Sequence, residues 1–263
     1  MLTTRYVTGS PNWIDVGTRD IEGAKAFYGG LFGWEFRSAG PEAGGYGMFQ
    51  LNGKTVAGGM AISEEQGSPS WTLYFQSPHV DATAKAVEQS GGAVLMEPMD
   101  VFDVGRMAIF GDPAGIGFGC WQPGTNKGLD LVGDQGTLCW TELYTPDVAA
   151  ATEFYGSVFG WETFDVPFPG GRYTTVNPAG TGEQGMFGGV VPLDSDPVET
   201  EAGAYWLPYF EVADTDASAA KARELGGTVR TEPTDMETVG RLAKLTDPYG
   251  ARFAVIKSTH AQG

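Results

Sequence analysis

Two carboxylates occupy matching places in apolar, strand-like segments of this 263-residue chain. Asp15 lies in residues 12–18, and Glu142 lies in residues 138–144. Burial disfavours a charged carboxylate and raises its pKa toward the range in which it can accept and return protons. We therefore predict that Asp15 and Glu142 are candidate catalytic general bases.

A structural role is the alternative for the same two carboxylates. Each could be tied to a neighbouring donor such as Arg106 or Arg241. Those arginines recur together with an upstream aspartate, Asp100 or Asp235, so we expect each of them to form a structural ion pair. Both readings of Asp15 and Glu142 stay open at the level of sequence.

An internal repeat explains why these positions match. The segment from Phe27 to Glu35 (FYGGLFGWE) recurs 127 residues later as FYGSVFGWE. Downstream, VGRMA and DPAG recur 135 residues later as VGRLA and DPYG. The second copy therefore has extra residues, chiefly in the Pro-rich, acidic stretch 192–203. We predict domains at 1–125 and 137–263, joined by a linker at 126–136.

Each copy has the same pattern of elements. A strand is followed by an amphipathic helix that Asp20 or Asp147 would cap and that Gly33 or Gly160 would end. Short strands follow, at about 46–51 and 54–62 in the first copy. A second strand–helix unit starts at Trp71 or Trp206. The pattern predicts an α+β fold of four βαβββ units, with Pro208 marking an edge strand or bulge.

Bulk composition narrows the possible partners. The net charge of −17 repels phosphate backbones and anionic lipids, so we expect no nucleic-acid or membrane partner. No apolar run approaches the roughly 20 residues that span a bilayer, and the first residues lack a signal region, which predicts a cytoplasmic protein. No Ser-His-Asp arrangement, phosphate loop or dinucleotide fingerprint occurs.

The repeated FY-x-x-x-FGW and D-P-x-G motifs, in this order and with four βαβββ units, resemble the vicinal-oxygen-chelate superfamily of glyoxalases, bleomycin-resistance proteins and dioxygenases. The resemblance covers nearly the whole chain. It implies that each copy curls its sheet into a cup whose inner face holds a ligand. Because this family includes metalloenzymes, epimerases and drug-sequestering proteins, the fold does not decide the function.

The metal-ligand positions implied by the resemblance hold unsuitable residues. In the first copy they fall on Trp13, Thr72 and Gly119, and in the second on Trp140, Leu207 and Ala254. Indole, methyl and hydrogen groups do not replace imidazole or carboxylate as ligands. The two histidines, His79 and His260, would have to meet from different copies. We therefore predict no metal and no other cofactor.

Strand alternation assigns the residues that face each cup. We expect ligand-binding side chains of aromatic and polar character, which suits a small molecule with a planar ring. The alternative is that the indoles only fill the cups. The predicted ligand-binding residues are Trp13, Tyr46, Met48, Thr72, Tyr74, Gln76, Trp121, Trp140, Tyr173, Tyr209, Glu211 and Arg252.

Three functions remain in view. The first is metal-independent binding of a small, partly aromatic molecule, for sequestration or natural-product metabolism, by a monomer or homodimer. The second is a metal-free isomerase, lyase or hydroxylase-like enzyme with Asp15 or Glu142 as general base. The third is a glyoxalase-type lyase, which the ligand positions disfavour.

Overall fold

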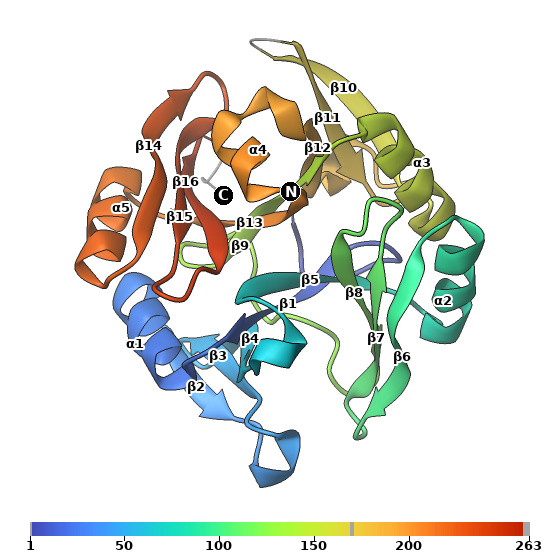
Figure 1. Ribbon diagram of the computed structural model, residues 1–263, viewed down its shortest axis with the longest axis horizontal. Coiled ribbons are helices and arrows are strands. Elements are labelled where there is room, and N and C mark those ends of the chain that lie inside the picture. Colours follow the sequence, from blue (N-terminus) through green and yellow to red (C-terminus); the bar gives the residue numbers. More distant parts are fainter. Residues whose placement is uncertain (1, 169–170, 260–263) are drawn as a thin grey trace. The chain divides into compact units, whose positions relative to one another are not determined.

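The computed structural model describes residues 2–168 and 171–259, which belong to two compact units (Figure 1). Unit one contains residues 73–128 and 141–206 together with the start of the chain up to residue 13. Unit two contains residues 14–72, 129–140 and the chain from residue 207 onward. Each unit therefore combines part of the first sequence copy with part of the second.

The element order follows the repeat. The first copy contains β1 (Pro11–Thr18), α1 (Ile21–Phe32), β2 (Glu35–Ser38), β3 (Gly47–Leu51), β4 (Lys54–Ala61), β5 (Ser70–Gln76), α2 (Val80–Gln89), β6 (Ala93–Val101), β7 (Gly105–Gly111) and β8 (Gly117–Pro123). The second contains β9 (Leu138–Thr145), α3 (Val148–Phe159), β10 (Glu162–Phe168), β11 (Gly171–Asn177), β12 (Gly188–Pro192), α4 (Pro197–Ala202), β13 (Tyr205–Glu211), α5 (Thr215–Glu224), β14 (Thr228–Met236), β15 (Gly240–Thr246) and β16 (Arg252–Ser258).

The strands form two mixed eight-stranded sheets, one from each copy. Their orders are β2-β3-β4-β1-β5-β8-β7-β6 and β10-β11-β12-β9-β13-β16-β15-β14. β1 pairs with β4 in parallel, and β5 pairs with β8 in parallel, as the βαβββ unit requires. The predicted α+β fold is confirmed. The prediction for Pro208 is wrong, because β13 lies inside its sheet and its register with β16 starts at Tyr209, just after the residue that lacks an N–H.

Helix ends follow the sequence signals. The Asp20 side chain accepts a 3.0 Å hydrogen bond from the Gly23 N–H, and the Asp147 side chain accepts one of the same length from Ala150. Gly33 and Gly160 end α1 and α3 in the left-handed region, with φ of 75° and 72°. Because that region strains any residue with a Cβ, glycine suits these positions.

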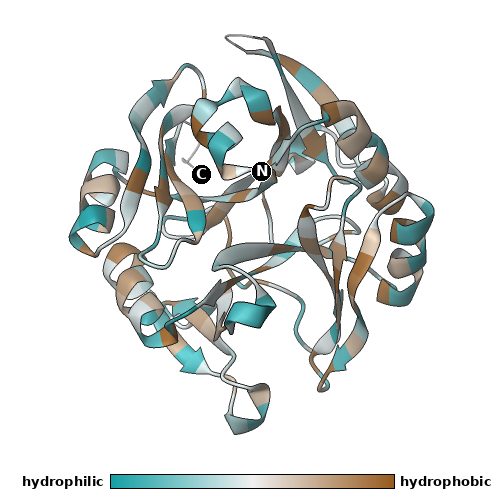
Figure 2. Ribbon diagram, in the orientation of Figure 1, coloured by the Kyte–Doolittle hydropathy of each residue, from teal (hydrophilic) through white to brown (hydrophobic). Residues whose placement is uncertain are grey.

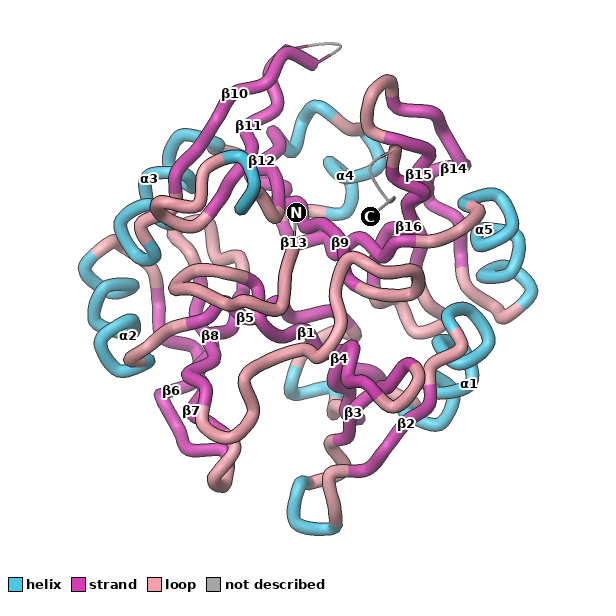
Figure 3. Tube along the Cα trace, turned by 180° about the vertical axis from the view of Figure 1, so that it is seen from behind, coloured by secondary structure: helices cyan, strands magenta, loops and turns pink. Residues whose placement is uncertain are grey.

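The repeated FY-x-x-x-FGW motif supplies an aromatic core to each unit. In unit two the rings of Tyr28 and Trp34 stack 5.6 Å apart, next to Trp71 and Phe253, and α1 lies beside α5 (Figures 1 and 3). In unit one the matching helices are α2 and α3, which also lie side by side. Their core rings include Phe75, Phe118, Tyr155, Trp161 and Trp206.

The stretch predicted as a linker packs into unit two. Leu129 is buried, Asp130 and Thr55 exchange backbone and side-chain hydrogen bonds of 2.8 Å, and the Trp34 indole donates to the Gly136 carbonyl at 2.8 Å. The extra residues of the second copy form the short helix α4. Within residues 2–168 and 171–259, none of the helices has the length and apolar character needed to cross a membrane.

Candidate functional site

Asp15 lies in unit two at the end of a row of three residues on neighbouring strands. Met48 on β3, Gly58 on β4 and Asp15 on β1 are in register. The Tyr46 hydroxyl donates a 3.1 Å hydrogen bond to Asp15 Oδ2. A Cβ on Gly58 would lie 2.0 Å from that hydroxyl oxygen, so the tyrosine reaches Asp15 only because Gly58 has no side chain. Asp15 is 9% exposed, and Tyr46, Met48 and Thr72 are half-buried.

The second copy repeats this arrangement in unit one. Gly189 on β12 is in register with Glu142 on β9, and the Tyr173 hydroxyl donates to Glu142 Oε1 at 2.8 Å. A Cβ on Gly189 would lie 2.2 Å from the Tyr173 ring. Both copies thus place a phenol over a glycine and onto a carboxylate, which we call the Tyr–Gly–acid set. The sequence gave no sign of it, because its glycines are spaced differently from its acids and tyrosines.

Glu142 also has a second phenol, which the sequence interpretation missed. The Tyr144 hydroxyl donates to Glu142 Oε2 at 2.8 Å, and burial together with Glu142 raises the pKa of Tyr144 well above its usual value. The Tyr144 ring stacks on Tyr205, whose hydroxyl donates to the fully buried Glu199 of α4 at 2.6 Å. Gly17 is the first copy's counterpart of Tyr144, so this extension belongs to the second copy.

The predicted arginine partners of the carboxylates bind elsewhere. Arg106 pairs with Asp100 at 2.9 Å and Asp81 at 2.8 Å. Arg241 pairs with Asp235 at 3.1 Å and with Asp216 at 2.6 Å. The predicted ion pairs with Asp100 and Asp235 are confirmed. The donors found on Asp15 and Glu142 are tyrosines, not these arginines.

Aromatic side chains from the first copy gather in unit one. The Trp13 indole is 6% exposed and stacks on Trp121, with ring centroids 6.5 Å apart. Tyr74 is buried and its ring covers Gly119. Gln76 is tied to the chain's start, because its amide donates to the Tyr6 carbonyl at 3.0 Å and its oxygen accepts from Asn12.

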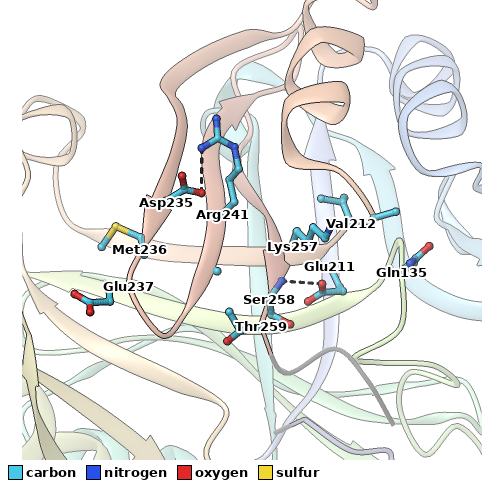
Figure 4. Close-up of a pocket in the computed structure, with 12 residues that line it drawn as sticks. Gln135, Glu211, Val212, Asp235, Met236, Glu237, Arg241, Lys257, Ser258 and Thr259 are labelled. Carbon is cyan, nitrogen blue, oxygen red and sulfur yellow. Dashed lines mark hydrogen bonds and ion pairs between the residues drawn. The ribbon is translucent and has the colours of Figure 1, made fainter.

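The predicted residues of the second copy from β13 and β16 lie in unit two. Tyr209 and Glu211 are buried, whereas Trp140 and Arg252 are half-buried. The Glu211 carboxylate accepts a 3.0 Å hydrogen bond from the Ser258 N–H (Figure 4). It borders a cavity of about 680 Å³ that also contacts Asp235, Arg241 and Lys257. Among the predicted site residues only Glu211 lines this hollow, which the sequence interpretation did not foresee.

The residues at the implied metal positions do not fit a divalent ion. On β8, a Cβ on Gly119 would lie 2.1 Å from the Tyr74 ring, so a tyrosine fills that place. On β4 and β12 the phenols of Tyr46 and Tyr173 occupy the space above Gly58 and Gly189. Across the described part of the chain, no three His, Cys, Asp or Glu side chains group as metal ligands would. His79 directly precedes α2, and His260 lies outside the described residues.

Comparison with known proteins was made on the whole chain. The family model described as "Glyoxalase/Bleomycin resistance protein/Dioxygenase superfamily" matches residues 10–119 and again 137–255. The anthracycline biosynthesis protein DnrV of Streptomyces peucetius is 38% identical, over 97% of this chain and 95% of its own. The putative glyoxylase CFP32 of Mycobacterium bovis is 40% identical, over 98% of both chains.

Solved structures share the fold at low sequence identity. The 2,3-dioxygenase LapB from Pseudomonas sp. KL28 is 13% identical, with a TM-score of 0.65 over 96% of this chain and 93% of its own. A Mn(II)-bound glyoxalase from Novosphingobium aromaticivorans is 17% identical, with a TM-score of 0.61 over 98% of this chain and 86% of its own.

Proposed function

The chain belongs to the glyoxalase/bleomycin resistance protein/dioxygenase superfamily, and from this premise we propose that it binds a small, planar, partly aromatic molecule without a metal ion, in natural-product metabolism. The observation that carries the proposal is the Tyr–Gly–acid set. At two matching places a phenol covers a glycine where a metal ligand would project. Aromatic and polar groups there suit a ring with a few polar substituents.

The relatives support the metabolic setting of this proposal. One is named for anthracycline biosynthesis and covers nearly the whole chain. Another is named a putative glyoxylase, but metal-dependent glyoxalase chemistry does not suit the tyrosines and glycines found at the implied ligand positions of this chain. We therefore favour a binding protein over a glyoxalase-type lyase.

A metal-free enzyme is the second candidate, and the hydrogen bond from Tyr46 to the buried Asp15 favours it. A carboxylate held beside a phenol can take a proton from a substrate while the phenol orients it. In the second copy both Glu142 oxygens already accept phenol hydrogen bonds, so a substrate would have to displace a tyrosine. This makes Asp15 the better candidate for a general base.

Calorimetric titration with a panel of planar quinones and non-aromatic dicarbonyl compounds tests the proposal. We expect binding of at least one planar compound, unchanged after dialysis against a chelator, and elemental analysis showing far less than one transition metal per chain. One zinc, nickel, manganese or iron per chain that survives dialysis and is required for binding would contradict metal independence. Turnover of a bound compound that Asp15→Asn abolishes would favour the enzyme.

A further inference from the structure

An exposed apolar surface lies along β6. Among the described residues, eight large hydrophobic side chains are exposed, and four of them fall within residues 95–102. Leu95 is 62% exposed, Met96 45%, Met99 48% and Phe102 63%. We call these four side chains the β6 patch. Figure 2 shows hydrophobic colour along this strand. Clustering of this kind marks interaction surfaces more often than scattered single residues do.

The second copy provides an internal comparison for the β6 patch. Glu97, Pro98 and Asp100 recur as Glu232, Pro233 and Asp235, so the strand framework is shared. All four patch residues are replaced by polar ones in β14 and the turn after it. The replacements are Arg230, Thr231, Thr234 and Glu237. Because β14 forms the same kind of strand without apolar side chains there, the fold does not require the patch.

Phe102 adds an independent observation. It lies in the turn after β6 with a φ of 48°, a left-handed conformation that a residue with a Cβ adopts only at a cost in energy. Its ring is largely in solvent, so burial within the chain does not offset that strain. The matching Glu237 does not have a positive φ. An aromatic ring held outward in this way suits an anchor for a partner.

We propose that the β6 patch is covered by the same surface of a second copy of this chain, forming a two-fold homodimer. The four side chains expose about 400 Å² of apolar surface. A stable interface buries about 800 Å² on each partner, a little over half of it apolar, so the patch matches the centre of such an interface.

Closure favours this occupant. One apolar edge in each chain gives a closed pair, whereas two such edges would build open assemblies. Arg230 and Glu237 place charges on the matching edge of the second copy, which discourages association there. Within β6, Pro98 and two register shifts interrupt the edge, so the contact is made by side chains and not by added backbone pairing.

Charge predicts the salt dependence of the dimer. Each chain has a net charge of −17, and the exposed Glu97 and Asp103 lie beside the patch. Two copies therefore repel each other, and salt screens that repulsion without weakening apolar burial. The homodimer should tighten as salt rises. A basic protein partner would instead bind more weakly with salt.

Sedimentation equilibrium of the full chain tests the proposal. The variant Leu95→Arg/Met96→Thr/Met99→Thr/Phe102→Glu carries residues that β14 already tolerates, so it should fold with an unchanged circular dichroism spectrum. We expect the wild type to be a dimer, and this variant to raise the dimer dissociation constant by at least about tenfold. A control variant, Phe164→Ser/Val166→Thr on β10, should dimerise as the wild type does, although it also removes exposed apolar side chains.

The reciprocal variant Arg230→Leu/Thr231→Met/Thr234→Met/Glu237→Phe gives each chain two apolar edges, and it should form assemblies larger than a dimer. A monomeric wild type at high micromolar concentration would overturn the proposal. A dimer that survives the four-residue change, or that loosens with added salt, would overturn it equally.

Discussion

Tyr28 donates a 3.0 Å hydrogen bond to Asp247, which lies 219 residues further along the chain, and Trp71 donates to the Tyr28 hydroxyl at 3.1 Å. Unit one repeats this chain of contacts from Trp206 to Tyr155 to Asp112. In each unit the tyrosine comes from the FY-x-x-x-FGW motif of one copy and the aspartate from the D-P-x-G turn of the other. The two repeated motifs are therefore partners within each core.

Tyr28→Phe should destabilise the fold by about 1–3 kcal/mol, because it leaves two buried polar groups without their hydroxyl partner. Tyr249→Phe is the matched control, since its hydroxyl donates to Asp20 at 3.0 Å in an exposed place. We expect the control to change stability by less than about 0.5 kcal/mol. Urea unfolding of both variants measures the difference, and equal losses would show that the buried relay has no special weight.

The two copies also predict opposite pH effects for two aspartates. Burial raises the pKa of Asp247 above its ordinary value of 3.8, so the folded state holds this proton more tightly than the unfolded state. Its stabilising contribution is complete below that value and is lost as pH rises through the folded pKa. The advantage of Asp247→Asn over the wild type in melting temperature should therefore be larger at pH 7 than at pH 4.

Asp216 is the counterpart with the opposite sign. Its hydrogen bonds with Arg241 lower the pKa of Asp216, so its contribution is present above 3.8 and is lost as pH falls through the folded pKa. Asp216→Asn should thus cost more at pH 7 than at pH 3. Thermal unfolding followed by circular dichroism across this range checks both variants, and parallel pH profiles for the two would contradict the assignment.

Sequence signals sufficed where the cause is local. Asp20 caps α1 and Gly33 ends it because one side chain and one backbone conformation decide each point. The Tyr–Gly–acid set depends on strand register, which brings Gly58 between Tyr46 and Asp15 from three strands. Nothing in the residue types around Gly58 shows that register. The same holds for α4, whose Glu199 is recognisable only as part of an acidic insertion until Tyr205 is seen to contact it.

Trp13 and Trp140 differ in their expected effect on ligand affinity. If a ring packs beside the Trp13–Trp121 pair, Trp13→Ala should weaken binding by about 0.5–1.5 kcal/mol. Trp140→Ala should matter less, because more charged residues surround the second copy's predicted face and must lose water when an apolar ring binds. Calorimetry with the tightest planar ligand compares the two, after unfolding curves establish that both variants are folded. Equal losses, or a loss confined to Trp140→Ala, would reverse the assignment.

Gly58→Ala should act through Tyr46. The added methyl group would meet the phenol that reaches Asp15, so the tyrosine must move or the strands must shift, at about 1–3 kcal/mol. If the hydroxyl contact is what the glycine permits, Tyr46→Phe should cost little more in the Gly58→Ala background than the wild-type background would lose by Gly58→Ala alone. Unfolding free energies of the two single variants and the double variant give this coupling.

The second copy supplies the comparison for that cycle. Gly189→Ala would press on Tyr173 in the same way, but Glu142 keeps its second phenol from Tyr144, which is held against Tyr205. The coupling between Gly189 and Tyr173 should therefore be measurable, while Glu142 stays in place. If Gly58→Ala lowers affinity for a planar ligand and Gly189→Ala does not, the first copy's Tyr–Gly–acid set is the one that meets the ligand. Additive effects of Gly58→Ala and Tyr46→Phe on unfolding would show instead that the glycine and the tyrosine are independent.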